Sequence, residues 1–431
     1  MRRERGVSFV ITLAILAGLI ALLATTLANE RQGFQDSLAR IESDRARTMA
    51  YAGLQRSLAA VYASQSDTGS TTSSSGTTTT NDKSTNMNQE WATVGQKGDE
   101  RFVVGNGSFR LQIVDASSFL NVNTITQDQL QKLPLTDEQI DSWLDYRETS
   151  TTARANGAKD DFYQNLPQPY NAALQRMETV DELLQVKGFT PADIYEPSTN
   201  TTSSGIDLTG TNGELLALAD ILTASSYSPN TNADGQAKTN VNAQGTSAQA
   251  LQQQPLSLPA NLAQQIAARK NWTGLKDILA LPGASDTNIA KRILENLSTS
   301  AGTRVEGKIN LNTATEPVLS AIPQLTPDMV QSILQRQSQG FTTLGDLTDI
   351  AGFTGAALQD TADLFTVTSQ SFLARVIGKS GDQSVALEAF IEVRDGTPVI
   401  VQIFQPPFND MRSRWNWQDD ATSDTTLAEG A

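Results

Sequence analysis

The chain has 431 residues, of which 39% are hydrophobic and 18% are charged, and its formal net charge is −15. That length accommodates two or three domains with separate cores. The chain contains neither histidine nor cysteine, which excludes Ser-His and Cys-His catalysis, the usual zinc sites, iron–sulfur clusters and disulfides. The acidic charge argues against nucleic acid as the main partner, because phosphate binding needs clustered positive charge.

The N-terminal segment predicts a membrane-spanning helix. Residues 1–6 include Arg2, Arg3 and Arg5, and the next 22 residues, 7–28, carry no charge. A helix of that length spans about 33 Å, enough to cross the hydrocarbon core of a bilayer. The arginines predict a cytoplasmic N-terminus. A cleaved secretory signal is the alternative, but its apolar region is usually shorter.

The helical pattern continues beyond the apolar segment. No proline lies between residues 7 and 62, and apolar residues recur at helical spacing on one side. We therefore predict one continuous helix over 7–63. The residues expected on its apolar side are Phe34, Leu38, Ile41, Met49, Ala52, Leu58 and Val61.

A sheet divided by a long insertion is predicted next. Residues 64–90 are rich in Ser and Thr and read as a linker. Two short strands, around 102–104 and 109–114, flank a Gly-Asn-Gly turn. Three more strands are expected near the C-terminus, at 371–377, 385–394 and 398–404. We predict that all five form one antiparallel sheet, and that the acidic segment after Phe408 is frayed.

The insertion contains an internal repeat. An Asn-x-Asn motif occurs within 119–124 and 308–313, with a weaker copy at 238–242, and helical segments follow each copy. We predict small helical bundles in which the Asn side chains cap helices, with Gly188 and Gly352 as left-handed C-caps. Helix-hairpin-helix modules of DNA-binding proteins look similar. Their phosphate-binding turns are Gly-rich, whereas the turns after Leu133 and Ile322 contain Pro, so we interpret the modules as protein-packing folds.

The start of the chain resembles the type IV pilin and pseudopilin signature, through Arg5-Gly6-Val7-Ser8-Phe9 and the apolar run after it. The resemblance implies cleavage between Gly6 and Val7 by a prepilin peptidase, followed by methylation of the Val7 amine. Most family members carry Glu at the fifth mature position, where this chain has Ile11. A missing Glu is a feature of the minor pseudopilin K family of type II secretion systems, and it marks a subunit at the filament tip.

The insertion resembles the same pseudopilin K family, most specifically in the loop 156–163 and the helix 180–188. The resemblance implies an α+β fold: a long N-terminal helix and a pilin-like antiparallel sheet, split by an all-α insertion of repeated helix-hairpin-helix or SAM-like modules. Calcium occurs in this family, and the carboxylates of Asp160 and Asp161 suit an oxygen-ligated cation. The alternative is a solvated loop with no metal, so no cofactor is required.

The remaining candidate residues do not indicate a catalytic site. We find no catalytic constellation and predict that the chain is not an enzyme. Trp91, Trp143 and Trp272 are expected in cores. Trp415 and Trp417 are candidates for a partner surface.

These patterns define an organisation. The N-terminal part consists of a leader at 1–6, a long helix at 7–63 with its membrane part at 7–28, and a linker at 64–90. The sheet is formed by 91–117 and 365–410, and an acidic tail follows at 411–431. The insertion consists of a first helical module at 118–200, a divergent second region with linkers at 201–300 and a third module at 301–364.

The function implied by the resemblance is that of a minor pseudopilin, which caps the periplasmic pseudopilus and nucleates its assembly. It implies a single-pass inner-membrane protein with a periplasmic C-terminal domain. The implied partners are other minor pseudopilins through the helix and sheet, the prepilin peptidase, membrane lipid, and secreted substrate or the outer-membrane secretin. Two alternatives remain open: a minor pilin of another type IV pilus-like system for adhesion or surface display, and a membrane-anchored DNA-uptake protein.

Overall fold

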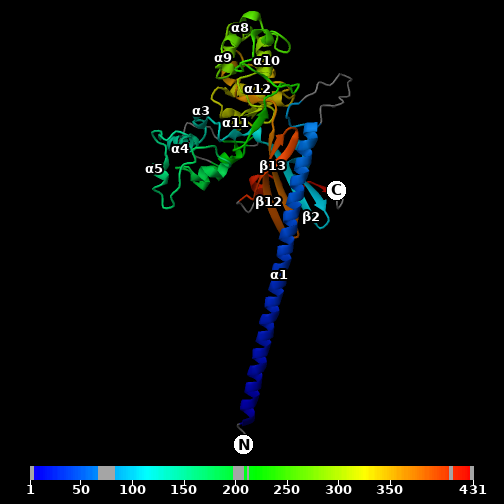
Figure 1. The fold of residues 1–431 in the computed structure, drawn as a ribbon. Helices are drawn as coiled ribbons and strands as arrows, with labels where there is room; N and C mark the ends of the chain where they lie inside the picture. The colour runs from blue at the N-terminus through cyan, green and yellow to red at the C-terminus, as the bar shows by residue number, and fades with distance from the viewer. Residues whose placement is uncertain (1–3, 67–82, 198–207, 211–212, 407–410, 428–431) are drawn as a thin grey trace.

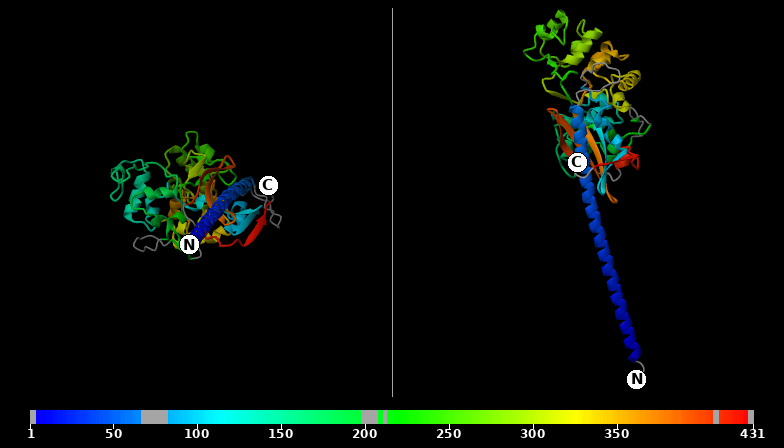
Figure 2. Two further views of the ribbon diagram at one scale, coloured as in Figure 1. Left: turned by 90° about the horizontal axis from the view of Figure 1, so that it is seen from below. Right: turned by 90° about the vertical axis from the view of Figure 1, so that its right-hand side faces the viewer.

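A computed structural model describes residues 4–66, 83–197, 208–210, 213–406 and 411–427. Most of the expected linker and the first three residues of the expected leader lie outside these ranges. The described chain forms a long protruding helix, a sheet that packs against the upper part of that helix, and a helical head beyond the sheet (Figures 1 and 2).

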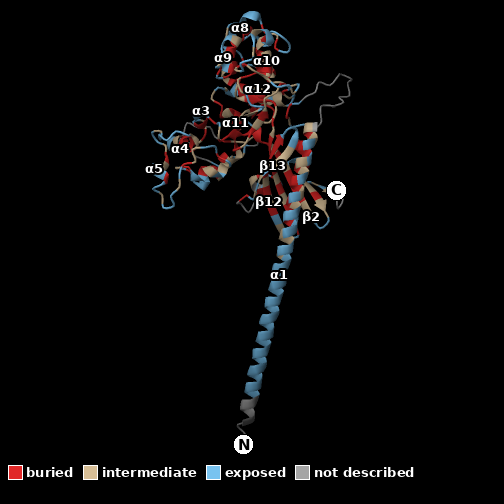
Figure 3. Cartoon of the chain, in the orientation of Figure 1, coloured by how far each residue is buried: buried red, intermediate tan, exposed pale blue. Residues whose placement is uncertain are grey.

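The N-terminal helix α1 runs continuously over Glu4–Ser66, which confirms the predicted helix and extends it by three residues at each end. Its lower half stands free of the rest of the chain, and its upper half lies across one face of the sheet (Figure 1). Burial along α1 therefore begins only where the helix reaches the sheet (Figure 3).

The sheet has six strands in the order β13-β12-β11-β2-β1-β14. The five expected strands are present and pair antiparallel, in the predicted positions on both sides of the insertion. Their bounds are β1 Glu100–Val104, β2 Gly107–Asp115, β11 Ser371–Ser380, β12 Gln383–Arg394 and β13 Thr397–Phe404. Two short segments precede β1: helix α2, Glu90–Thr93, and the 3₁₀ turn Val94–Gly98.

The C-terminal segment corrects the prediction of a frayed tail. After the short helix α14, Met411–Arg414, the chain forms β14, Ser423–Thr426, which pairs in parallel with β1. The sheet is therefore mixed rather than purely antiparallel. A bidentate contact joins Arg101 to Asp424, at 2.7 and 2.8 Å. The polar sequence of β14 gave no alternating apolar pattern, because β14 is an edge strand.

Small residues seat α1 on the sheet. The face of α1 toward the sheet carries fully buried small side chains at helical spacing, namely Ala46, Ala50, Ser57 and Ala60, together with the buried Gly53. Opposite them, Gly378 of β11 lies so close that a Cβ there would overlap the carbonyl oxygen of Ala46 and the backbone nitrogen of Ala50. The helix and the sheet thus touch backbone to backbone.

This seat corrects the predicted apolar side of α1. Val61 is buried, and Met49, Ala52 and Leu58 pack at the edge of the core as expected. Phe34, Leu38 and Ile41 are 65%, 43% and 48% exposed, because they lie below the point where the sheet begins. The residues that make the closest contact are small ones, which a search for large apolar residues passes over.

The insertion consists of three modules, each closed by a parallel pair of two-residue strands. The first strand of each pair carries the first Asn of the Asn-x-Asn motif, and the second strand ends the module. The pairs are β3 Leu120–Asn121 with β4 Leu222–Thr223, β6 Thr239–Asn240 with β7 Leu297–Ser298, and β9 Ile309–Asn310 with β10 Phe365–Thr366. The first, middle and third modules therefore span 120–223, 239–298 and 309–366.

Short helices fill each module. The first module contains α3 Gln127–Leu130, α4 Asp137–Arg147, α5 Asp160–Tyr163, the 3₁₀ helix Val180–Gln185, α6 Pro191–Tyr195 and the 3₁₀ turn Leu218–Asp220. The middle module contains α7 Ala248–Leu251, α8 Ala260–Ala268, α9 Leu275–Leu279 and α10 Thr287–Asn296. The third contains α11 Glu316–Ser320, α12 Pro327–Gln337, the 3₁₀ helix Leu344–Asp349 and α13 Gly355–Thr361.

These boundaries correct two expectations. Residues 208–210 and 213–223 lie at the close of the first module, where β4 pairs with β3, rather than in a separate divergent region. The middle copy of the repeat, which is the weaker one in the sequence, is a full module whose last helix is α10. Gly188 and Gly352 have φ values of 87° and 94°, so the predicted left-handed positions are confirmed.

The Asn-x-Asn motif clamps each module rather than capping a helix. The first Asn accepts a hydrogen bond from the backbone N–H two residues later. The second Asn bonds both the N–H and the carbonyl of one distant residue, and these pairs are Asn123 with Met177, Asn242 with Trp272 and Asn312 with Phe341. The Asn312 clamp measures 2.7 and 2.9 Å. Helix capping falls instead to hydroxyl side chains such as Thr126 and Thr326.

The middle module stands on a two-stranded stalk. β5, Tyr227–Pro229, leads into it, β8, Arg304–Glu306, leads out, and the two strands pair antiparallel. The helices α8, α9 and α10 consequently form the far end of the molecule (Figure 1). One continuous apolar core runs through all three modules, and a separate core lies between α1 and the sheet.

We predict that Gly378→Ala lowers stability by about 1–3 kcal/mol, because an added methyl group overpacks a contact that side-chain rotation cannot relieve. Urea unfolding of the full chain in detergent, followed by tryptophan fluorescence, measures the change. The matched control is Gly245→Ala, since a Cβ at Gly245 meets no atom within 4 Å. Equal midpoints for the two variants would contradict the close seat of α1.

Candidate functional site

The exposed half of α1 is the most distinctive surface of the described chain. Large apolar side chains from Phe9 to Leu27 are 54–69% exposed. One helix in the described residues is long and apolar enough to cross a membrane, and its most apolar 18-residue window has a mean hydropathy of 2.5 with none of it buried. A water-soluble surface rarely exposes an apolar patch of this size, so this segment requires lipid or a partner.

The predicted processing residues lie at the base of this helix. Gly6 and Val7 fall within α1, although their side chains lie outside the described part of the chain. Ile11 is 54% exposed on the free half of α1. No acidic residue occurs between Val7 and Ala28, so this segment carries no carboxylate side chain.

The structure separates Asp160 and Asp161 rather than directing them to one cation. The carboxylate of Asp160 accepts a hydrogen bond from the Ala172 N–H at 2.8 Å, and Asp161 is exposed. Among the described residues, no group of three or more acidic side chains is arranged to hold a metal ion.

Two basic side chains occupy the oxygen atoms around this loop. The Lys159 ammonium donates to the carbonyl oxygens of Asp145 and Glu148 at the C-terminal end of α4. Arg154 pairs with the buried Asp145 carboxylate at 2.7 Å and with Glu148 at 2.8 Å. Burial lowers the pKa of Lys159, and the charges of Asp145 and Glu148 oppose that shift. The oxygens that would suit calcium are thus already bound by cations of the chain itself, and the residues present do not fit the metal.

The tryptophan predictions divide into two groups. Trp91, Trp143 and Trp272 are buried in cores, as expected. Trp415 and Trp417 are also buried, at 6% and 5% exposure, so the prediction that they form a partner surface is wrong. Their indole N–H groups donate to Glu388 at 3.0 Å and to Gln112 at 3.1 Å, which fastens the C-terminal segment to the outer face of the sheet.

A buried carboxylate joins the sheet to the head, and sequence reasoning missed it. Asp115 ends β2 and is 1% exposed. It accepts hydrogen bonds from the Asn310 amide and the Thr313 hydroxyl, each at 2.7 Å. Burial raises the pKa of Asp115, and these hydrogen bonds oppose the shift. The only signal in the sequence was that Asn310 and Thr313 belong to the repeat motif.

The fold and these surfaces define a protein anchored by one apolar N-terminal helix, with a mixed sheet and a modular helical head. Models of the family described as "Type II secretion system (T2SS), protein K" match residues 124–196 and 309–368, which fall in the first and third modules. A relative, type II secretion system protein K of Pectobacterium carotovorum subsp. carotovorum, is 31% identical over 216 residues. These matches make the chain similar to the type II secretion system protein K family over part of its length.

The extent of these likenesses is limited. The match to the Pectobacterium protein covers 45% of this chain and 60% of the relative. The chain is also similar to a chain of the GspK-GspI-GspJ complex from enterotoxigenic Escherichia coli. That likeness has a TM-score of 0.38 and 13% identity, and covers 88% of this chain and 99% of the other.

We predict that Lys159→Met lowers stability by about 1–3 kcal/mol, because two carbonyl oxygens lose a buried donor. We also expect the melting temperature of the unaltered chain to be the same with EDTA as with added Ca²⁺. Thermal unfolding and limited proteolysis within 148–172 measure both effects, with the exposed Lys379→Met as control. Melting that falls in EDTA, together with a stable Lys159→Met variant, would show that calcium holds the loop.

Proposed function

We propose that the chain is a minor pseudopilin of a type II secretion system, which caps the periplasmic pseudopilus at its tip and nucleates its assembly. The observation that carries this proposal is one apolar helix, free over its membrane-length half and seated on a sheet above it, in a chain whose head matches the protein K family. Such a helix can leave the bilayer and enter a filament without unfolding the head.

Membrane anchoring and orientation follow from the sequence of α1. Arg2, Arg3 and Arg5 favour a cytoplasmic N-terminus, which puts the head in the periplasm of an inner-membrane protein. Cleavage by a prepilin peptidase between Gly6 and Val7, with methylation of the new amine, would leave α1 with an apolar start in contact with lipid.

The tip position is supported by Ile11 and by the size of the head. A carboxylate at the membrane centre costs about 2.5–3.5 kcal/mol unless it is paired. A subunit with none above it has no neighbouring amine to pair with, so an apolar residue is favoured there. A head of three modules beyond the sheet would also obstruct the addition of another subunit on top of it.

Other minor pseudopilins are the proposed partners, through α1 and the sheet. Phe34, Leu38 and Ile41 lie between the membrane-length segment and the sheet, and all three are exposed. Their helical spacing suits packing against the helix of a neighbouring subunit. The head then faces outward, toward secreted substrate or the outer-membrane secretin.

We infer that the modules are helix-hairpin-helix or SAM-like folds used for packing rather than for binding DNA. In the turn before α4, the N–H of Leu135 bonds the Leu133 carbonyl and the N–H of Thr136 bonds Gln139. The N–H of Leu325 in the third module bonds the Ile322 carbonyl. These donors are not available for phosphate, which disfavours the DNA-uptake alternative. The other alternative is a minor pilin for adhesion. The N-terminal helix would suit that function too, but the matches to the protein K family do not support it.

We further infer a structural role without catalysis or a required cofactor. The chain lacks histidine and cysteine, and the carbonyl groups of the Asp145–Glu148 segment are bound by Lys159. The similarity of the chain to a family of secretion-system components is consistent with a role in assembly rather than in catalysis.

Mass spectrometry of the mature protein tests the anchor. We expect a chain that begins at Val7, carries one methyl group on its amine and remains in the inner membrane. A Gly6→Leu variant should keep its first six residues, because the peptidase requires the small residue before the cut. A mature chain that begins at Met1, or one cut after Ala28, would contradict the pseudopilin proposal.

A complementation assay tests the tip position. In cells that lack this chain, secretion should fail, and Ile11→Glu should restore it to within about twofold, since an acid this close to the end of the membrane helix can reach water at the membrane surface. The matched variant Ile15→Glu puts the acid one turn deeper in the membrane, where its cost is higher, and should restore far less. Normal secretion without the chain, or equal failure of both variants, would count against this role.

A further inference from the structure

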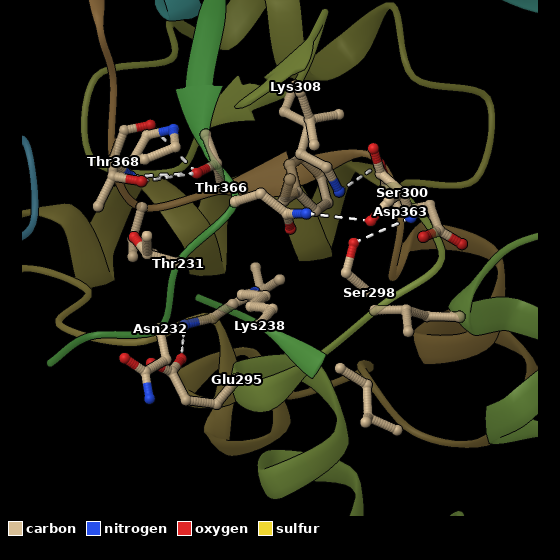
Figure 4. A pocket seen from close by; sticks show the side chains of 18 of the residues that line it. Thr231, Asn232, Lys238, Glu295, Ser298, Ser300, Lys308, Asp363, Thr366 and Thr368 are labelled. Atoms are coloured by element: carbon tan, nitrogen blue, oxygen red, sulfur yellow. Dashed lines mark hydrogen bonds between the residues drawn. The ribbon is translucent and has the colours of Figure 1, made fainter. Parts of the chain in front are cut away.

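A cavity of about 280 Å³ lies at the junction of the stalk, the middle module and the third module. Its walls come from the chain after β5, from the ends of β7 and α10, and from the closing strand β10. Figure 4 shows two lysines, Lys238 and Lys308, among the hydroxyl side chains that line it. No residue of this cavity belongs to the surfaces that the proposed function uses.

The two lysines occupy equivalent positions in the repeat. Lys238 precedes the Asn-x-Asn strand β6, and Lys308 precedes the strand β9. Each ammonium donates one hydrogen bond to a carbonyl near the end of its own module, from Lys238 to Leu294 at 2.8 Å and from Lys308 to Asp363 at 3.0 Å. An ammonium group has three donors. Each lysine therefore has further donor capacity at the cavity.

The nearby carboxylates do not neutralise these lysines by direct contact. Among the described residues, no carboxylate oxygen lies within 4 Å of either nitrogen. The Glu295 carboxylate instead accepts from the backbone N–H groups of Ala233 and Leu344. The Asp363 carboxylate accepts from the N–H of Lys276 at 3.3 Å.

The cavity lining carries two lysines and two carboxylates, and burial disfavours the charged form of both lysines. Burial lowers the pKa of Lys238 to about 8, the charge of Lys308 acts in the same direction, and Glu295 and Asp363 oppose both. Burial also lowers the pKa of Lys308. Two like charges thus share a poorly solvated space at the meeting point of two modules.

The rest of the lining supplies neutral hydrogen-bonding groups. Residues with hydroxyl side chains line the cavity, among them Thr231, Thr273, Ser298, Ser300, Thr366 and Thr368. Hydroxyl donors around paired ammonium groups form a setting that suits a compact ligand with several acceptor oxygens.

We propose that this cavity binds a small oxyanion, a carboxylate or phosphate group, between Lys238 of the middle module and Lys308 of the third. The bound group receives charge-assisted hydrogen bonds from both lysines and relieves their mutual repulsion. It bridges the two modules and so stiffens the stalk that joins them.

Calorimetric titration of the full chain in detergent micelles at constant ionic strength tests the proposal. The probes are inorganic phosphate and succinate, with chloride as the ionic-strength control and succinamide as the neutral analogue. We expect saturable heat from phosphate, succinate or both, and none from succinamide. The two oxyanion arms distinguish a phosphate source from a carboxylate source. Heat that is the same for the oxyanions and for chloride overturns the proposal.

Variants locate the site. Lys238→Met and Lys308→Met should each weaken binding about tenfold, the loss expected when one charge-assisted hydrogen bond is removed. Lys276→Met is the matched control, because the Lys276 ammonium pairs with Asp360 at 2.5 Å and does not line the cavity. Binding that both cavity variants retain at full strength overturns the proposal.

The pH dependence of the unaltered chain gives a test that no variant can confound. Because Lys238 loses its proton above about pH 8, oxyanion affinity should fall from about pH 7 to about pH 9. Lys308, whose pKa burial also lowers, contributes in the same direction, and Glu295 and Asp363 are the acidic side chains that line the same cavity. Affinity that is constant over this interval overturns the assignment of the ligand to these lysines.

Discussion

The backbone-to-backbone contact between α1 and β11 is the constraint on which the rest of the structure depends. Because the facing positions are Ala46, Ala50 and Gly53 on the helix and Gly378 on the strand, the helix cannot move sideways without a collision. Dispersion and the exclusion of water then act over a long, closely matched surface. A force applied along the anchor therefore reaches β11, at the centre of the sheet, directly.

From the sheet, the connection to the head passes through a few buried polar groups. Asp115 ends β2 and holds Asn310 and Thr313, which begin the third module. The amide of Asn310 also bonds the carbonyl of Thr85, which lies in the described end of the expected linker. A buried carboxylate with several donors is rigid, since each unpaired alternative is costly. The N-terminal helix, the sheet and the head are thus rigidly connected in that order.

The large features of this fold could be predicted from the sequence because each has a strong local signal. The uncharged run before Ala28 and the alternating strands on both sides of the insertion are examples. The seat of α1 could not be predicted, because Ala and Gly carry no hydrophobic period and their importance lies in what they let approach. β14 was missed for a related reason, since an edge strand of Ser, Asp and Thr looks like a tail. The Asn-x-Asn motif was found, but its clamp to residues about 30 to 54 positions away needs the tertiary structure. The partners of Lys159 and Arg154 could not be predicted either, because this loop meets the end of α4 only in the folded structure.

The stalk has one more consequence. The two strands β5 and β8 lie side by side, so the polypeptide enters and leaves the middle module at the same place. The middle module is therefore an insertion that the rest of the fold accommodates at a single point. A change in the length of this module would therefore leave the ends of β5 and β8 side by side, and with them the geometry of the sheet and of the other two modules.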